Sequence, residues 1–118
     1  MDALASFLET AHWLKIKEEA YFCDDGCLQT PLLEFTNKFN LHEHGFQAWK
    51  IVRGTQIKER DGIGRRGYII PVRVISGEPR LLSDPAHPVL EPGIPIAFNK
   101  EAFLSPALYL ILALPRTL

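Results

Sequence analysis

The chain has 118 residues, of which 47% are hydrophobic, and its formal net charge is −1. This length suits one domain with an apolar core, and the composition excludes an intrinsically disordered chain. The longest apolar run, residues 107–114, is much shorter than the roughly 20 residues that span a bilayer. Residues 1–14 lack the basic start of a signal peptide, so we expect a cytoplasmic or otherwise intracellular protein without a membrane segment.

Charge is distributed unevenly along the chain. Residues 1–45 carry three basic and eight acidic side chains, for a net charge of −5, whereas residues 46–80 carry eight basic and three acidic ones, for a net charge of +5. Two interpretations follow from this distribution. Either the middle third meets an anionic partner, or the acidic and basic parts of the chain face each other.

The first third of the chain is expected to be helical. Apolar residues recur at steps of three and four over residues 2–22, which predicts an amphipathic helix with a break near Trp13. Residues 23–27, Cys-Asp-Asp-Gly-Cys, are typical of a turn. A second helix is predicted from Thr30, a good N-cap residue, to Gly45, a natural helix stop.

Two strands are predicted in the middle third. Residues 46–54 and 67–76 are dominated by β-branched and aromatic residues, and we expect them to pair as a hairpin whose charged tip is residues 55–66. Pro71 has no N–H group to donate, so the second strand should be an edge strand at that position.

The last third changes in character. Residues 76–96 contain five prolines, which predicts an extended or turning arm that wraps over the core and forms no helix. Residues 107–114 form either a short buried helix or a buried strand, and periodicity does not separate the two. The predicted fold is one α+β domain over residues 1–118: an acidic part with N-terminal helices (1–29), a helix with a basic, wing-like central β-hairpin (30–75), and a proline-rich arm with an apolar C-terminal element (76–118).

Gly62, Gly64 and Gly67 have the G-x-G-x-x-G spacing that can cradle a phosphate. A dinucleotide-binding loop needs a helix after it, but strand-like residues follow here, and the P-loop lysine pattern is missing from the sequence. We therefore expect a hairpin tip, whose Arg65 and Arg66 suit bidentate contacts with phosphate. The alternative is a solvated tip without a partner.

The order of helix, strand, basic glycine-containing loop and strand over residues 30–75 resembles the second half of a winged-helix DNA-binding domain. It is similar to the small winged helices at the C-termini of phage and plasmid primase-helicases and to regulatory factor X domains. The resemblance implies a recognition helix followed by a wing that contacts DNA. The predicted nucleic-acid contacts are Asn37, Lys38, Lys50, Arg53, Lys58, Arg60, Arg65, Arg66 and Arg73.

Two cysteines and two histidines are candidate zinc ligands. Cys23 and Cys27 are followed by His42 and His44, and two thiolates with two imidazoles can complete a tetrahedral site. His12 is a possible substitute ligand. The two histidines are closer in sequence than the usual spacing of zinc-finger ligands. The alternative is therefore a turn flanked by reduced thiols, with the histidines on the surface.

The function expected from these features is nucleic-acid binding. The protein would be a small replication or transcription accessory protein that grips phosphates with its basic hairpin. The alternative is a non-catalytic interaction or assembly protein, whose basic third contacts an acidic protein surface or a second copy of the chain. We expect no enzyme, because the sequence holds no G-x-S-x-G motif, and only residues 42–44 combine carboxylate and histidine.

Overall fold

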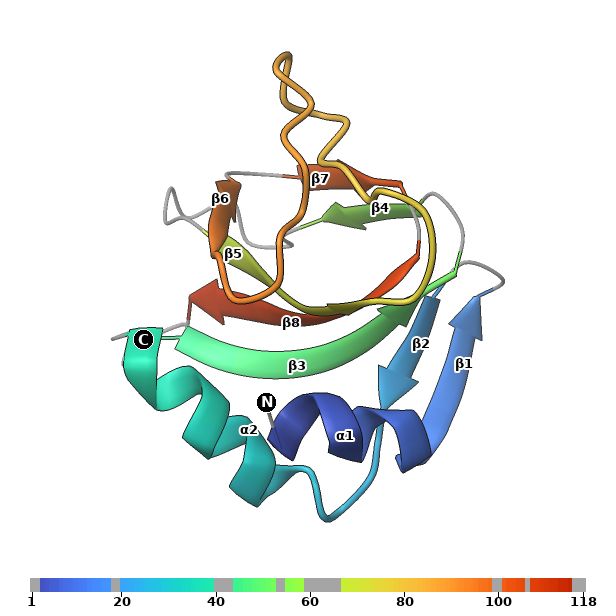
Figure 1. Ribbon diagram of the computed structural model, residues 1–118, viewed down its shortest axis with the longest axis vertical. Helices are drawn as coiled ribbons and strands as arrows, with labels where there is room; N and C mark the ends of the chain where they lie inside the picture. The colour runs from blue at the N-terminus through green and yellow to red at the C-terminus, as the bar shows by residue number, and fades with distance from the viewer. Residues whose placement is uncertain are drawn as a thin grey trace.

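A computed structural model describes residues 3–17, 20–39, 44–52, 55–58, 67–98, 101–105 and 107–115 (Figure 1). Its elements are α1 (Ala3–Thr10), β1 (Trp13–Lys17), β2 (Ala20–Cys23), α2 (Gln29–Thr36), the 3₁₀ helix η1 (Asn37–Phe39), β3 (His44–Ile51), β4 (Thr55–Lys58), β5 (Gly67–Val74), β6 (Ile96–Phe98), β7 (Glu101–Leu104) and β8 (Leu108–Pro115). The fold is therefore of the α+β class, as the sequence predicts. Within the described ranges, no helix is long and apolar enough to cross a membrane.

Six strands form one antiparallel sheet in the order β1-β2-β3-β8-β5-β6, and β4 pairs with β7 in a separate ladder. The C-terminal β8 takes a central place because its run of apolar residues has to be buried on both faces. Leu108 and the four residues from Leu110 to Ala113 are all buried. The strand alternative for residues 107–114 is thus confirmed.

β4 and β7 form a separate ladder that is close in sequence to the β3–β8 ladder. Ile51 faces Leu108 at the end of the β3–β8 ladder, and Thr55 faces Leu104 at the start of the β4–β7 ladder. In both segments, three residues lie between these two pairs. The β4–β7 ladder lies above the six-stranded sheet, in a second layer (Figure 1).

Two apolar cores lie on opposite faces of the six-stranded sheet. On one face α1 and α2 pack against β3, β5 and β8, and this core includes Leu4, Leu8 and Phe35 of the helices. The other core joins the sheet to Leu104 of β7 and to Leu81 and Leu90 of the segment after β5. The molecule thus has a helical layer, a sheet, and a layer made by β4, β7 and residues 75–95 (Figure 1).

The structure corrects the first predicted helix. α1 ends at Thr10, and the residues beyond it form β1 and β2, with β1 starting at the predicted break near Trp13. Leu14 and Ile16 are two residues apart, which places them on one face of a strand. Pairing of β1 and β2 with the rest of the sheet satisfies their backbone groups, so tertiary structure overrides the helical period in this segment.

The predicted wing-like hairpin is also wrong as a pairing. Its two strands exist as β3 and β5, but β8 lies between them and pairs with both. Part of the predicted tip, Thr55–Lys58, is a strand in the upper layer. Residues 59–66, which contain Gly62 and Gly64, lie outside the described residues.

The boundaries of the second helix differ from the prediction. α2 begins at Gln29, so Thr30 lies inside the helix, and Leu28 occupies the N-cap position without a side-chain cap. Gly45 lies in β3 and does not stop the helix. Turn residues therefore identified this helix but not its ends.

Prolines shape the outer side of β5 and the segment that follows it. β6 pairs with Gly67–Ile69 only, so at Pro71 no described strand pairs with the outer side of β5, as the missing N–H group predicts. The Gly93 amide donates to the Pro71 carbonyl at 2.8 Å. Between β5 and β6 the chain forms no helix, and it contacts the rest of the fold through isolated bridges such as Leu81 to Leu104.

Candidate functional site

Five side chains form a row across five adjacent strands on the helix-bearing face of the sheet. The strand registers place them opposite one another in sequence, because Lys15 pairs with Tyr21, Tyr21 with Lys50, Lys50 with Tyr109, and Tyr109 with Arg73. Cations and phenol rings therefore alternate from β1 to β5. We name these five residues the basic–aromatic row.

The period of a strand assigns the row to this face. Tyr21, Lys50 and Tyr109 are each two residues from a member of the helix-side core, namely Cys23, Ala48 and Ile111, and residues two apart share a face. Arg73 reaches the same face because a bulge between Pro71 and Arg73 shifts the register of β5.

The row remains accessible beside the helices. Lys15 and Arg73 are exposed, while Tyr21, Lys50 and Tyr109 are half-buried. The ammonium group of Lys50 lies 5.6 Å from the centroid of the Tyr21 ring, within the range of a cation–π interaction. This contact aligns a positive charge with an aromatic ring at the middle of the row.

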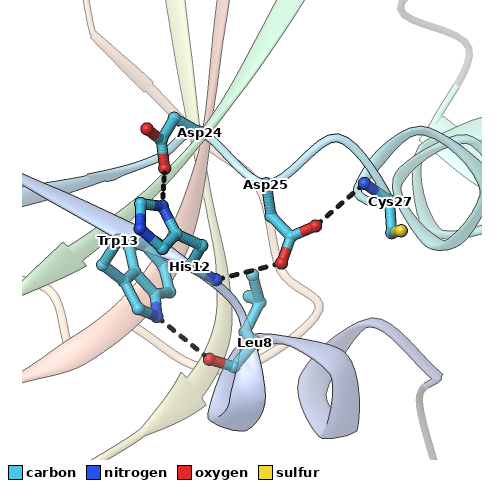
Figure 2. Close-up of polar contacts among 6 residues, drawn as sticks. All are labelled: Leu8, His12, Trp13, Asp24, Asp25 and Cys27. Carbon is cyan, nitrogen blue, oxygen red and sulfur yellow. Dashed lines mark hydrogen bonds and ion pairs between the residues drawn. The ribbon is translucent and has the colours of Figure 1, made fainter.

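Small residues next to the row allow a second aromatic contact. The Trp13 and Tyr109 rings stack with centroids 5.6 Å apart and an interplanar angle of 23°, although they come from β1 and β8. Between these strands lie Cys23 and Ala48, whose small side chains leave room for the two rings. The Trp13 indole also donates to the Leu8 carbonyl at 3.2 Å, so its ring is held against α1 (Figure 2).

The charge state of the row is set by its neighbours. Burial raises the pKa of the Tyr109 hydroxyl, the charge of Glu9 raises it further, and Arg73 opposes both. Tyr109 therefore stays neutral at physiological pH and adds no negative charge. Arg73 forms an ion pair with Glu9 of α1, which orients the guanidinium group at the end of the row.

Alternating cations and rings suit one type of ligand in particular. Single-stranded nucleic acids present phosphates for cations and flat bases that stack on aromatic side chains. The alternative role is internal to the fold, because Lys50 with Tyr21 and Arg73 with Glu9 already satisfy one another in part. Substitution of individual members separates these two roles.

The other predicted nucleic-acid contacts are dispersed. Lys38 in η1 lies over the Phe35 and Phe39 rings at 4.9 and 5.7 Å, and Asn37 is the C-cap residue of α2. Lys58 ends β4 in the upper layer. Predicted contacts outside the described residues are Arg53, Arg60, Arg65 and Arg66. The structure therefore joins only Lys50 and Arg73 of the predicted set.

A separate polar cluster ties the end of α1 to the turn after β2 (Figure 2). The His12 imidazole lies 2.6 Å from the Asp24 carboxylate, and Asp25 accepts from the backbone amides of His12 and Cys27 at 3.0 and 2.9 Å. The hydrogen bond to Asp24 and the charges of both aspartates raise the pKa of His12. The hydrogen bonds that the backbone amides of Cys27 and His12 donate lower the pKa of Asp25.

This cluster fastens the chain and offers no catalytic arrangement in the described structure. Asp25 lies between His12 and Cys27, and the Cys27 thiol points away from the imidazole (Figure 2). The Cys23 thiol is buried, and its pKa is raised by that burial. A nucleophile and a base therefore do not meet here.

The predicted zinc ligands are brought together only in part. Cys23 is buried and Cys27 is exposed, both near the turn, and His42 lies outside the described residues. His44 starts β3 five residues before Trp49, the nearest β3 residue that pairs with β2, which is about 17 Å along the strand. Among described side chains, no group of three or more His, Cys, Asp or Glu is placed to hold a metal ion. Zinc binding that involves His42 stays a prediction.

Sequence reasoning missed Lys15, Tyr21 and Tyr109. Their signal is period-two alternation, because Lys15 is flanked by Leu14 and Ile16 and each tyrosine sits between apolar residues. Because a helical period also fits residues 2–22, the alternation typical of a strand was not recognised in that segment. The alignment of five strands, moreover, is not encoded in any one segment.

Comparisons with known proteins returned no match, whether against family models, curated proteins or solved structures.

Proposed function

We propose that the protein binds single-stranded nucleic acid across the basic–aromatic row. The observation that carries this proposal is the alternation of Lys15, Tyr21, Lys50, Tyr109 and Arg73 on five adjacent strands. Five neighbouring strands give the row a length of about 20 Å, which accommodates a short stretch of nucleotides. This surface differs from the recognition helix and wing that the sequence resemblance implies.

Each member of the row has a physical role in the proposal. Lysine and arginine neutralise phosphates and release counterions, and this gives affinity without base specificity. The tyrosine rings supply stacking surfaces, which tolerate every base because each base has a flat face. A single strand is favoured over a duplex because stacked base pairs do not expose their faces to a sheet.

Glu9 is an acidic side chain that the structure places against the row. It pairs with Arg73 and carries a negative charge beside the phosphate path. The pair orients the guanidinium group but also reduces its attraction for phosphate. Replacement of Glu9 by Gln should therefore strengthen binding, whereas a purely structural row predicts no gain.

Fluorescence anisotropy with labelled oligonucleotides of about 15 nucleotides tests the proposal. Tyr21→Leu removes a stacking surface and should weaken single-strand binding by about fivefold or more. Lys50→Gln should flatten the slope of log affinity against log salt by about 0.7. Lys38→Gln removes the same charge from η1 and is the matched control, expected to leave affinity unchanged.

The outcome that contradicts this proposal is equally specific. If the wild-type protein binds no single strand at about 50 mM salt, where phosphate contacts are strong, the row has no nucleic-acid role. Equal losses from Lys38→Gln and Lys50→Gln would assign binding to general charge and not to the row.

A second candidate is duplex binding through the basic segment 58–66. Two observations favour it: the net charge of +5 over residues 46–80, and the place of the segment in the sequence between β4, which ends at Lys58, and β5, which begins at Gly67. In this mode Arg65 and Arg66 contact phosphates without reading bases.

A further inference from the structure

β1 is an edge of the six-stranded sheet with an apolar strip on its other face. The strip consists of Leu14, Ile16, Phe22 and Trp49. Leu14 is 48% exposed, and Ile16, which lies at the bulge between Lys15 and Lys17, is 51% exposed, although both are large hydrophobic residues. No strand in the described part of the chain pairs with the outer side of β1, which lies at the outer edge of the sheet (Figure 1).

The apolar strip is continuous with the core. Leu14 is opposite Phe22, Phe22 is opposite Trp49, and Trp49 is opposite the fully buried Leu110. The Phe22 and Trp49 rings meet edge to face at 5.3 Å and are half-buried. The exposed fraction therefore rises from the buried Leu110, through the half-buried Trp49 and Phe22, to Leu14 at the edge. This is expected if one more strand would complete the sheet.

The charge of β1 restricts the kind of strand that can pair with its open side. The strand carries Lys15 and Lys17 and no acidic residue, and the lysines alternate with Leu14 and Ile16. A second copy that added its own β1 would bring together two strands of the same positive charge, and like charges on neighbouring strands are destabilising. Edge lysines and the bulge between Lys15 and Lys17 also discourage indiscriminate pairing.

We infer that β1 accepts an extended acidic–apolar segment of a partner protein by strand addition. Main-chain hydrogen bonds to the open side of β1 would supply affinity. Apolar residues of the partner would cover Leu14 and Ile16, and its acidic residues would complement the positive charge of the strand. This surface shares Lys15 with the phosphate path proposed above, whereas its apolar strip lies on the other face of the sheet.

A titration with two labelled peptides of about eight residues tests the inference. One peptide alternates valine and glutamate between threonine ends, and the other has lysine in place of each glutamate. We expect the acidic peptide to bind at least about tenfold more tightly, with affinity falling as salt is raised. Amide NMR shifts should concentrate on Trp13–Lys17.

Variants make the site assignment specific. Ile16→Thr removes apolar cover and should weaken the acidic peptide by about fivefold, a loss of about 1 kcal/mol. Lys15→Glu should reverse the preference between the two peptides. Leu33→Thr is the matched control, because Leu33 on α2 is 47% exposed and lies away from β1.

Three results would overturn the inference. These results are that neither peptide binds, that both bind equally, or that Leu33→Thr weakens binding as much as Ile16→Thr. Light scattering adds a further check, since a dimer that Ile16→Thr dissociates would make a second copy the occupant. The titrations contain no nucleic acid, so their failure is separate from any failure of the proposed single-strand binding.

Discussion

At the scale of single residues, Gly67 has a role in packing that its motif does not indicate. It is the last glycine of the G-x-G-x-x-G pattern and the first residue of β5. A Cβ atom at this position would lie 2.7 Å from the Phe98 ring, closer than real Cβ contacts come. The glycine is therefore needed for Phe98 of β6 to pack onto β5, whether or not Gly62 and Gly64 approach a ligand.

Gly67→Ala should destabilise the protein by about 1–3 kcal/mol, the usual cost of overpacking a buried site. Gly45→Ala is the control, because Gly45 also lies in a strand and a Cβ there would meet nothing within 4 Å. Chemical denaturation measures both. Equal stability of the two variants would show that Phe98 moves aside without cost.

His12 gives the polar cluster of Figure 2 a pH dependence. Its pKa is raised above the ordinary 6.5 by Asp24 and Asp25, so the folded state binds the proton more tightly than the unfolded state. The resulting stability is present below the ordinary pKa and is lost as pH rises through the folded value. Asp25 has the opposite sign, since its lowered pKa stabilises above 3.8 and that contribution is lost in acid.

We expect the melting temperature of the wild type to exceed that of His12→Gln by the most near about pH 6, and by little near about pH 9. The difference should be small, because the His12 side chain is 73% exposed. Thermal melts of both proteins across this range provide the measurement. A difference that does not change with pH would mean that His12 acts through its neutral form.

At the scale of elements, β8 organises the sheet. It pairs with β3 on one side and β5 on the other, and β7, the strand before it in sequence, pairs with β4 in the second layer. One segment near the C-terminus thus connects both layers. Its sequence shows no polar face, because neither face of the strand is fully open to water.

Leu110→Asp should abolish soluble folded protein. Leu110 is fully buried in the middle of β8, and an unpaired buried carboxylate costs several kcal/mol, a large part of the stability of a small domain. Leu33→Asp places the same group on exposed α2 and should fold normally. Soluble expression and circular dichroism distinguish them, and a native-like melt of Leu110→Asp would show that the centre of β8 is dispensable.

At the scale of the whole molecule, the fold brings residues of the acidic and the basic third of the chain together. Lys15 from the acidic third and Lys50 and Arg73 from the basic third lie in one row. Glu9, from the acidic third, pairs with Arg73. Part of the charge asymmetry is therefore compensated within the fold, as one of the two interpretations of the sequence expects.

Arg65 and Arg66 carry further basic charge in the middle third of the chain. Changing both Arg65 and Arg66 to Ala should flatten the slope of log duplex affinity against log salt by up to about two units, one per lost phosphate contact. Stability should change little if these arginines are surface residues. Parallel titrations with Gly64→Val test the nucleotide-cradle alternative, in which the glycine change would matter more than the arginines.

The sequence by itself determined the α+β class, the two strands at β3 and β5 and the burial of residues 107–114. These properties depend on local composition, alternation and the length of apolar runs, which act within a segment. It also named Lys50 and Arg73 as predicted nucleic-acid contacts, and the structure leaves Lys50 half-buried and Arg73 exposed. Proline chemistry likewise placed an edge at Pro71.

Only the tertiary structure decided which strands are neighbours. The sequence favoured a hairpin of β3 and β5, but β8 is apolar on both faces and takes a central position where both faces are covered by a core, so the C-terminal strand separates them. Pairing within the same sheet turned residues beyond Thr10 from helix into the strands β1 and β2. The basic–aromatic row exists for this reason alone, because its five residues come from five segments whose register is set by the packing of the sheet.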